Sequence, residues 1–287
     1  AGNQYVFGDA VQTGSIKSQL ENPDLKWETT TELNVGLDFG FLNNRITGSF
    51  EYFHKVVSDL LAFRKLNSLM EVSTIADNIG ATQSTGYEFS LNTVNLTGPF
   101  KWNTTLNISS YNDRWKERNP DVVLAPYEKE AAPIRAIYGC VSDGILQIGE
   151  TPPASMPDLL PGQMKVKDLN GFDPNDGSKL LGHPDGKIDA ADRIYLGSTD
   201  PKVIIGFGNM FEYKNFDLNI FFYGMFGQYL ANSNRAKYGP SGCEYILQRQ
   251  NYSKEVLERW TPDNPTNKFP SGFYSAYYGG DDWLLEK

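Results

Sequence analysis

The chain is poor in the residues from which several classes of site are built. Among its 287 residues there are two cysteines and two histidines. Two cysteines are too few for a disulfide framework, so we expect free thiols, with a Cys140–Cys243 disulfide across two long loops as the alternative. His54 and His183 lie far apart and have no cysteine partner at zinc-ligand spacing. The sequence therefore contains no zinc motif.

Positive charge and long apolar runs are also scarce. The chain has 26 Lys and Arg against 35 Asp and Glu, a formal net charge of −9 at pH 7. Nothing here could neutralise a row of phosphates, so nucleic acid is excluded as a partner. No apolar run approaches the roughly 18 to 20 residues of a membrane helix, which excludes helical spans only. The first ten residues lack a charged region followed by an apolar core, so we expect no signal peptide and interpret the chain as a fragment.

Motifs of catalysis are missing as well. The sequence has no glycine-rich phosphate loop after a strand and no Gly-x-Ser-x-Gly. Its many carboxylates offer pairs that resemble those of a glycosidase. Such a pair needs a defined separation and one raised pKa, and a sequence shows neither. We therefore predict that the chain is not an enzyme.

Aromatic residues, by contrast, are plentiful, and many of them alternate with polar residues. This period-two pattern predicts three pairs of β-strands, each joined by a short turn. Long outer loops separate the pairs, and one of them contains SKEVLERWTP, for which we predict a short helix starting at Ser253. The predicted strand pairs span about 27–56, 87–111 and 202–227, and the loops about 57–86, 112–201 and 228–287.

The unequal connections and the aromatic residues favour an outer-membrane barrel, which has short periplasmic turns and long outer loops. Alternation alone equally allows a soluble β-sandwich or lectin-like domain, so both architectures stay open at this point. The aromatics beside the short turns would form a girdle at one membrane interface: Phe39, Phe41, Phe100, Trp102, Phe211, Tyr213 and Phe216. In a barrel a polar set would line the hydrated interior: Glu32, Asn34, Asp38, Glu51, Glu88, Asn92, Asn103 and Asn107.

The segment MKVKDLNGFDPNDGSKLLGHPDGKIDAADRIYL (164–196) contains an interrupted calcium loop. Without residues 172–184 it reads DLNGDGKIDAADR, which has oxygen-bearing side chains and a glycine at the spacing of such loops. Its place between predicted strands points away from an EF-hand helix pair. The predicted ligands are Asp168, Asn170, Asp185, Lys187 through its carbonyl, Asp189 and Asp192.

The insertion leaves two interpretations of this loop open. It separates Asn170 from Asp185, so the ligands need not converge, although Asp173 and Asp176 inside it could substitute. Either the loop holds calcium, which would rigidify it, or its Asp and Asn side chains cap their own backbone.

Several long segments together resemble the SusC/RagA-type TonB-dependent outer-membrane transporters. These are NPDLKWETTTELNVGLDFGFLNNRITGSFEYF, DNIGATQSTGYEFSLNT, PIRAIYGCVSDGILQ, the acidic loop, IYLGSTDPKVIIGFGNMFEYKNFDLNIFFYGMFGQ and EVLERWTPDNPTNKFP. They occur in the family's order over nearly the whole chain. The resemblance implies an all-β fold, with antiparallel strands that form part of a large, 22-stranded outer-membrane β-barrel with long extracellular loops.

The same resemblance implies a function and its partners. Residues 1–287 would be one partial barrel domain in the outer membrane of a Gram-negative bacterium, surrounded by lipid. The parent protein would import oligosaccharides or peptides with a SusD-like surface lipoprotein as a lid, and TonB would act through a plug domain. The chain shows no plug and stops at GDDWLLEK, where family members continue. The alternative function is a soluble, secreted, calcium-stabilised glycan-binding β module.

Overall fold

The computed structural model describes residues 3–8, 10–14, 20–66, 72, 74–120, 124–232, 234, 252–272 and 285–286. Strands dominate it, and its short helical elements include two 3₁₀ turns, η1 (Ala190–Asp192) and η3 (Lys254–Glu258). In this part of the chain no helix combines the length and apolar character that a membrane crossing requires.

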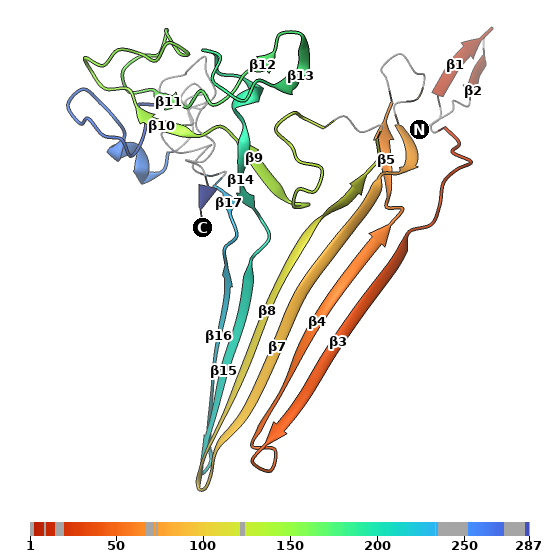
Figure 1. Ribbon diagram of the computed structural model, residues 1–287, viewed down its shortest axis with the longest axis vertical. Helices are drawn as coiled ribbons and strands as arrows, with labels where there is room; N and C mark the ends of the chain where they lie inside the picture. Colours follow the sequence, from red (N-terminus) through yellow and green to blue (C-terminus); the bar gives the residue numbers. More distant parts are fainter. Residues whose placement is uncertain are drawn as a thin grey trace.

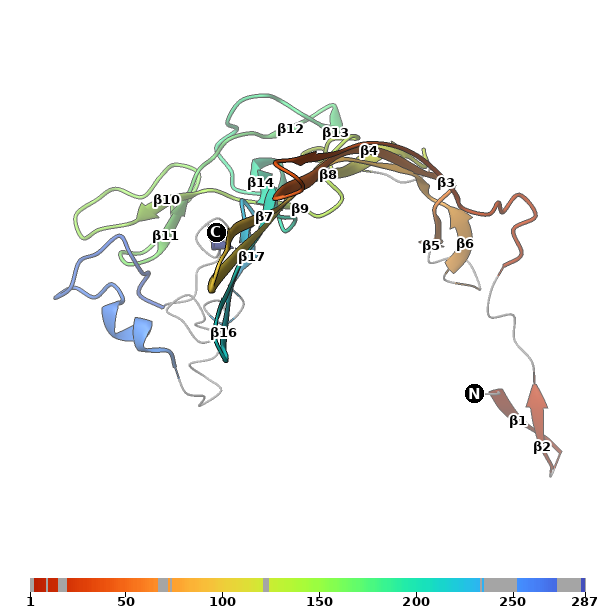
Figure 2. The same cartoon turned by 90° about the horizontal axis from the view of Figure 1, so that it is seen from below.

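Six long antiparallel strands form one curved sheet in the order β16-β15-β8-β7-β4-β3 (Figures 1 and 2). Each predicted strand pair is a hairpin, which confirms the pairing expected from the period-two pattern. The strands are β3 (Thr29–Phe41), β4 (Ile46–Ser58), β7 (Gly80–Thr97), β8 (Phe100–Arg118), β15 (Val203–Tyr213) and β16 (Phe216–Phe226).

The observed strands are longer than predicted in the middle pair, and the predicted loops are not structureless. β7 and β8 extend well beyond 87–111. The period-two pattern does not predict these extensions, because residues 82–85 and 112–114 are polar on both faces and do not alternate. Short strands occur at the N-terminus and in all three predicted loops: β1 (Asn3–Phe7), β2 (Ala10–Gly14), β5 (Leu61–Lys65), β6 (Thr74–Asn78), β9 (Ala136–Gly139), β10 (Ser142–Ile145), β11 (Met164–Val166), β12 (Phe172–Asp173), β13 (Asp176–Leu180), β14 (Ile194–Ser198), β17 (Leu230–Ala231) and β18 (Leu285–Glu286).

The three short turns lie at the end of the sheet opposite to the long connections (Figure 1). The β3–β4 turn places Leu42, Asn43 and Asn44 in the left-handed region, with φ of 54°, 54° and 63°. Asparagine tolerates this conformation better than most residues, which suits the Asn pair to so tight a turn. Lys214, with φ of 54°, begins the still shorter β15–β16 turn.

The strand register gives the sheet a polar and an apolar face, because residues directly opposite each other on neighbouring strands share a face. One row crosses the sheet as Leu37, Phe50, Phe89, Ile108 and Ile205. The adjacent row contains Gly36, Glu51, Glu88 and Ser109. Every residue predicted for the polar set falls on the second face, and every predicted girdle aromatic falls on the first.

The hydrophobic core lies in the long connections and not against the sheet. Buried side chains there form one cluster: Cys140, Leu146, Met156, Leu159 and Val166, with Ile188 packed on it. On the sheet, Leu37 is 65% exposed and Phe222 is 61% exposed. The other sheets in the described part of the chain are two-stranded, and the apolar rows stay uncovered. A β-sandwich would bury such rows against a second sheet, so the sandwich interpretation fails.

Two distant segments combine into one outer unit, which we define as residues 133–200 together with 252–272. The indole of Trp260 is buried and donates from Nε1 to Oε1 of Gln147 at 2.8 Å. The main-chain N–H of Ser271 donates to the carbonyl of Gly162 at 2.7 Å. The helix predicted from Ser253 is present as η3, with Ser253 at its N-cap. Cys243 lies outside the described residues, so a bond to Cys140 stays a prediction.

Candidate functional site

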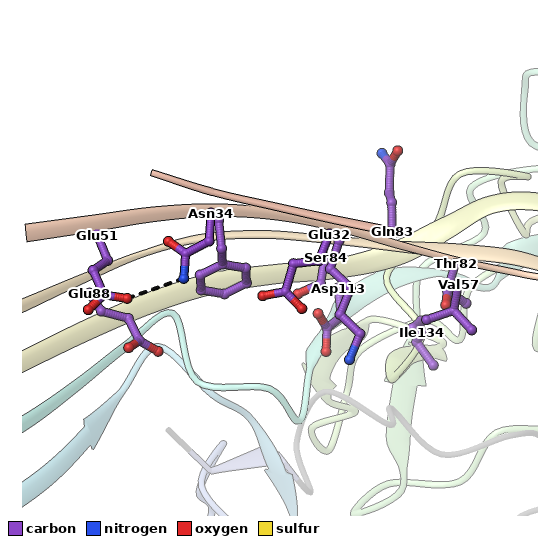
Figure 3. A pocket seen from close by; sticks show the side chains of 12 residues that line it. Glu32, Asn34, Glu51, Val57, Thr82, Gln83, Ser84, Glu88, Asp113 and Ile134 are labelled. Carbon is purple, nitrogen blue, oxygen red and sulfur yellow. Dashed lines mark hydrogen bonds between the residues drawn. The ribbon is translucent and has the colours of Figure 1, made fainter. Parts of the chain in front are cut away.

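A cavity of about 450 Å³ hollows the polar face of the curved sheet, which is its concave face (Figure 3). Asn34, Glu51, Glu88 and Asp113, from β3, β4, β7 and β8, project to the same side of the sheet. The side chain of Gln83 points to the opposite side, as expected for a residue one position out of phase.

Two of the carboxylates that line this cavity lie side by side at one end of it (Figure 3). Glu51 and Glu88 are directly opposite each other on β4 and β7. Like charges in that arrangement destabilise a sheet unless water or a counter-charge surrounds them. The Nδ2 group of Asn34 donates to Oε2 of Glu51 at 3.3 Å and orients that carboxylate. The concave face is therefore built to stay hydrated.

The aromatic ring of Phe53 interrupts the polar lining. Phe53 is directly opposite Gly86, where an added Cβ would lie 2.5 Å from Cζ of the ring. Glycine at this position thus lets the ring lie close to β7. The cavity combines a flat apolar surface with carboxylates, an amide and the ammonium group of Lys55.

Charge on the concave face is predominantly negative. Lys55 is the basic residue in the lining of the cavity, against the acidic residues Glu32, Glu51, Glu88 and Asp113. A neighbouring cavity of about 380 Å³ continues the face across β15 and β16, where Asn107, Phe221 and Tyr223 line it. Such a surface attracts cations by its potential.

The opposite, convex face carries aromatic rings near the short turns and again midway along β4 and β7. Near the short turns, Phe100 and Phe211 lie with centroids 6.0 Å apart, and Trp102 and Phe211 5.8 Å apart. Midway along β4 and β7, the rings of Tyr52 and Tyr87 are 5.3 Å apart. An aromatic belt beside an apolar band is typical of a membrane interface.

The convex face also contains a hydrogen-bonded polar network that the sequence pattern does not predict. The side chain of Asn209 points to this apolar face, where its Oδ1 accepts from Nε1 of Trp102 at 2.9 Å and from Oγ1 of Thr104 at 2.8 Å. Asn95 donates in turn from Nδ2 to Oγ1 of Thr104 at 2.7 Å. These hydrogen bonds satisfy the polar atoms among apolar neighbours. Thr104 is itself a polar residue in an apolar row of the sequence, but the sequence does not show that Asn209 is its partner.

The acidic loop brings together the residues on either side of its insertion. Residues 172–180 form the β12–β13 hairpin, and beyond it the N–H of Gly186 donates to Oδ2 of Asp168 at 2.8 Å. Asp192 is completely buried, and its Oδ1 accepts from the N–H of Leu169 at 2.7 Å. The same oxygen accepts from Asn170 at 3.1 Å, and Oδ2 accepts from Asp189 at 2.8 Å.

The other predicted ligands also face main-chain N–H groups. Oδ1 of Asn170 accepts from Gly182 at 2.7 Å, and Oδ1 of Asp185 from Lys187 at 3.0 Å. Asp189 caps η1 through the N–H of Ala191 at 2.7 Å. Asp176, the possible substitute ligand, bonds Lys179 and Ser178, and these contacts lower the pKa of its carboxyl.

The observed arrangement of the acidic loop is therefore the backbone-capping one. Among the described residues, no group of three or more His, Cys, Asp or Glu side chains is placed to hold a metal ion. The side-chain oxygens of the predicted ligands accept from main-chain N–H groups at Asp168, Asn170, Asp185 and Asp192. Calcium stays a prediction.

Replacing Asp192 with alanine is expected to destabilise the outer unit by about 3 kcal/mol, because three N–H groups would lose a buried, charged acceptor. Asp185→Ala is the matched control: this exposed carboxylate accepts from Lys187 alone, and about 0.5–1 kcal/mol is expected. The loss of stability in each variant is measured by chemical unfolding followed by hydrogen exchange, with and without calcium. Equal losses that appear only in calcium would show that a bound ion holds the loop instead.

The chain matches one family model and several known relatives. Residues 1–152, more than half of the chain, match the family model described as TonB dependent receptor-like, beta-barrel. The chain belongs to this family. It is 31% identical over 283 residues to TonB-dependent receptor P3 of Formosa agariphila, covering 92% of this chain and 26% of that protein. It is 29% identical over 260 residues to TonB-dependent receptor SusC of Bacteroides thetaiotaomicron, covering 88% of this chain and 25% of that protein.

Solved structures agree with the family in fold. The structure of the RagAB peptide transporter aligns with a TM-score of 0.74 and 21% identity, over 100% of this chain and 30% of that one. The chain thus spans about a quarter of the length of the curated relatives. As a member of the receptor family, it contributes barrel strands whose convex face is apolar and whose concave face is acidic and hydrated.

Proposed function

We propose that the chain forms part of the wall and outer mouth of an outer-membrane, TonB-dependent nutrient importer. The observation that carries this proposal is the two-faced sheet. Its uncovered apolar rows require lipid, because a soluble protein rarely leaves so large a contiguous apolar surface in water. The hydrated concave face would line the path of the cargo.

The relatives support a proposal for the cargo and the partners. SusC is a TonB-dependent receptor, and RagAB, whose fold the chain shares, is a peptide transporter by its description. We infer that this protein takes up oligosaccharides or peptides with a SusD-like lid lipoprotein, in the outer membrane of a Gram-negative bacterium. TonB would supply the energy through a plug in the complete receptor. A soluble glycan-binding module is disfavoured, because its apolar rows would need cover that the sheet lacks.

Deleting the gene for the complete protein is expected to abolish uptake of its oligomeric cargo, and removing TonB is expected to have the same effect. Uptake of fluorescently labelled oligosaccharides and peptides too large for porins measures both strains. Uptake of the corresponding monomers is the control and should not change. Oligomer uptake that survives both deletions, or a protein that fractionates with soluble proteins, would refute the proposed function.

A further inference from the structure

A third cavity, of about 700 Å³, lies beside the end of β8 near the long connections and shares Asp113 with the concave-face cavity. The pairing of β8 with β15 ends at Ser109 and Ile204, while β8 continues to Arg118. The strands diverge from there toward the long connections (Figure 1). The cavity fills this divergence, and its volume is in the range of small-molecule sites. Residues of both faces line it: Tyr111 and Asp113 from the concave face, and Thr85, Tyr87 and Asn112 from the convex face.

Four tyrosines from separate segments line the cavity: Tyr87 on β7, Tyr111 on β8, Tyr195 on β14 and Tyr229 after β16. Tyr229 is fixed, since its N–H donates to the carbonyl of Ser198 at 2.8 Å. Its ring also packs on Gly197, where an added Cβ would lie 2.4 Å from the ring. The rings are thus held in place before any ligand arrives, which lowers the entropy cost of binding.

Tyr195 is exposed, whereas Tyr111 and Tyr229 are half-buried. It is 47% exposed, and the ring of Tyr138 supports it edge-on, with centroids 6.0 Å apart. Partial burial, followed by the neighbouring Tyr138 and Tyr229, raises the pKa of its phenol above the ordinary value. The hydroxyl is therefore neutral at physiological pH and can both donate and accept.

The charges in the lining balance, in contrast to the concave-face cavity. Asp113 and Asp200 are the acidic residues, and Arg114 and Lys202 the basic ones. Asp200 is held in position by an ion pair with Arg135 at 3.5 Å and by Oγ of Ser198, which accepts from its N–H at 3.1 Å. A lining of zero formal charge favours a neutral ligand that can exchange many hydrogen bonds.

We propose that this cavity is a binding subsite for a neutral oligosaccharide. Pyranose rings have C–H faces that pack on aromatic rings, and hydroxyl edges that bond carboxylates, amides and phenols, all of which line the cavity. A peptide would need a free strand edge or an apolar side-chain pocket. The edge of β8 is already used there, because Trp115 and Asp113 bond Ala132 and Ile134 through their main chains.

This inference rests on the proposed function, to which it adds the class of cargo, and binding tests it independently of transport. The detergent-solubilised complete protein is titrated with neutral hexasaccharides of glucan, xylan, mannan and galactan type, and with uncharged hexapeptides. At least one oligosaccharide is expected to bind. Tyr195→Ala is expected to weaken that binding about tenfold or more, as for aromatic anchors of interfaces.

The controls separate stacking from folding. Tyr195→Phe keeps the ring and is expected to bind within about twofold of the native protein. Tyr252→Ala removes a 40% exposed tyrosine outside the cavity and is expected to have no effect. Binding of peptides alone, or oligosaccharide binding that Tyr195→Ala leaves intact, would overturn the proposal. Intact, Tyr195-dependent binding without uptake would instead support the subsite and count against the proposed function.

Discussion

Replacing Leu106 with arginine is expected to lower the stability of the membrane-inserted protein by about 2–4 kcal/mol. Leu106 lies midway along β8 on the convex face, between Leu91 of β7 and Phe207 of β15. In a bilayer this position faces hydrocarbon, where a guanidinium group loses its hydration and finds no counter-charge. Urea unfolding of the complete protein from lipid vesicles measures the loss.

The adjacent residue provides the matched control for this substitution. Asn107 lies on the concave face beside Gly206, and Asn107→Arg should change the stability by no more than about 0.5 kcal/mol. The contrast between neighbours of opposite phase tests which face meets lipid. A harmless Leu106→Arg, or two substitutions of equal cost, would mean that the convex face meets water.

Truncating Trp260 to alanine is expected to destabilise the outer unit by about 3–5 kcal/mol, the usual cost of removing a buried indole. The indole packs on Gly162, and its Nε1 bonds Gln147, so it joins residues 252–272 to the rest of the unit. We expect the amides of 252–272 to lose most of their protection in hydrogen exchange, whereas those of β3, β4, β7 and β8 keep theirs.

The control for this substitution lies on η3, just before Trp260 in the chain. Leu257 is 83% exposed, and Leu257→Ala should cost less than about 0.5 kcal/mol. Unchanged protection of 252–272 in Trp260→Ala would show that other contacts, such as Ser271 with Gly162, suffice to hold the segment.

The faces of the sheet could be predicted from the sequence because they depend on a local rule. Alternation with a period of two fixes the phase of each strand, and short turns fix the register between neighbours. Leu37 and Glu51 could thus be assigned to opposite faces before any coordinates were known. The rule ends where both faces meet water, which is why the extension of β7 to Gly80 and of β8 to Arg118 was not predicted.

The sites were less predictable, because they depend on contacts between distant residues. The spacing in the acidic loop identified the residues that meet across the insertion, such as Asp168 and Gly186. It could not decide whether their oxygens face a metal or N–H groups, because both arrangements use the same residues. The cavity of Tyr111, Tyr195 and Tyr229 depends on where β15 leaves β8, which no periodicity in the sequence encodes.

The separation of the buried cluster around Met156 from the sheet affects how the molecule denatures. The cluster is stabilised by withdrawal from water, whereas the long strands, in a bilayer, are stabilised by main-chain pairing and contact with acyl chains. Heat or urea would act on these two parts with different sensitivity, so unfolding would not be a single all-or-none event. One melting temperature would average two processes, and each part should be followed by its own probe.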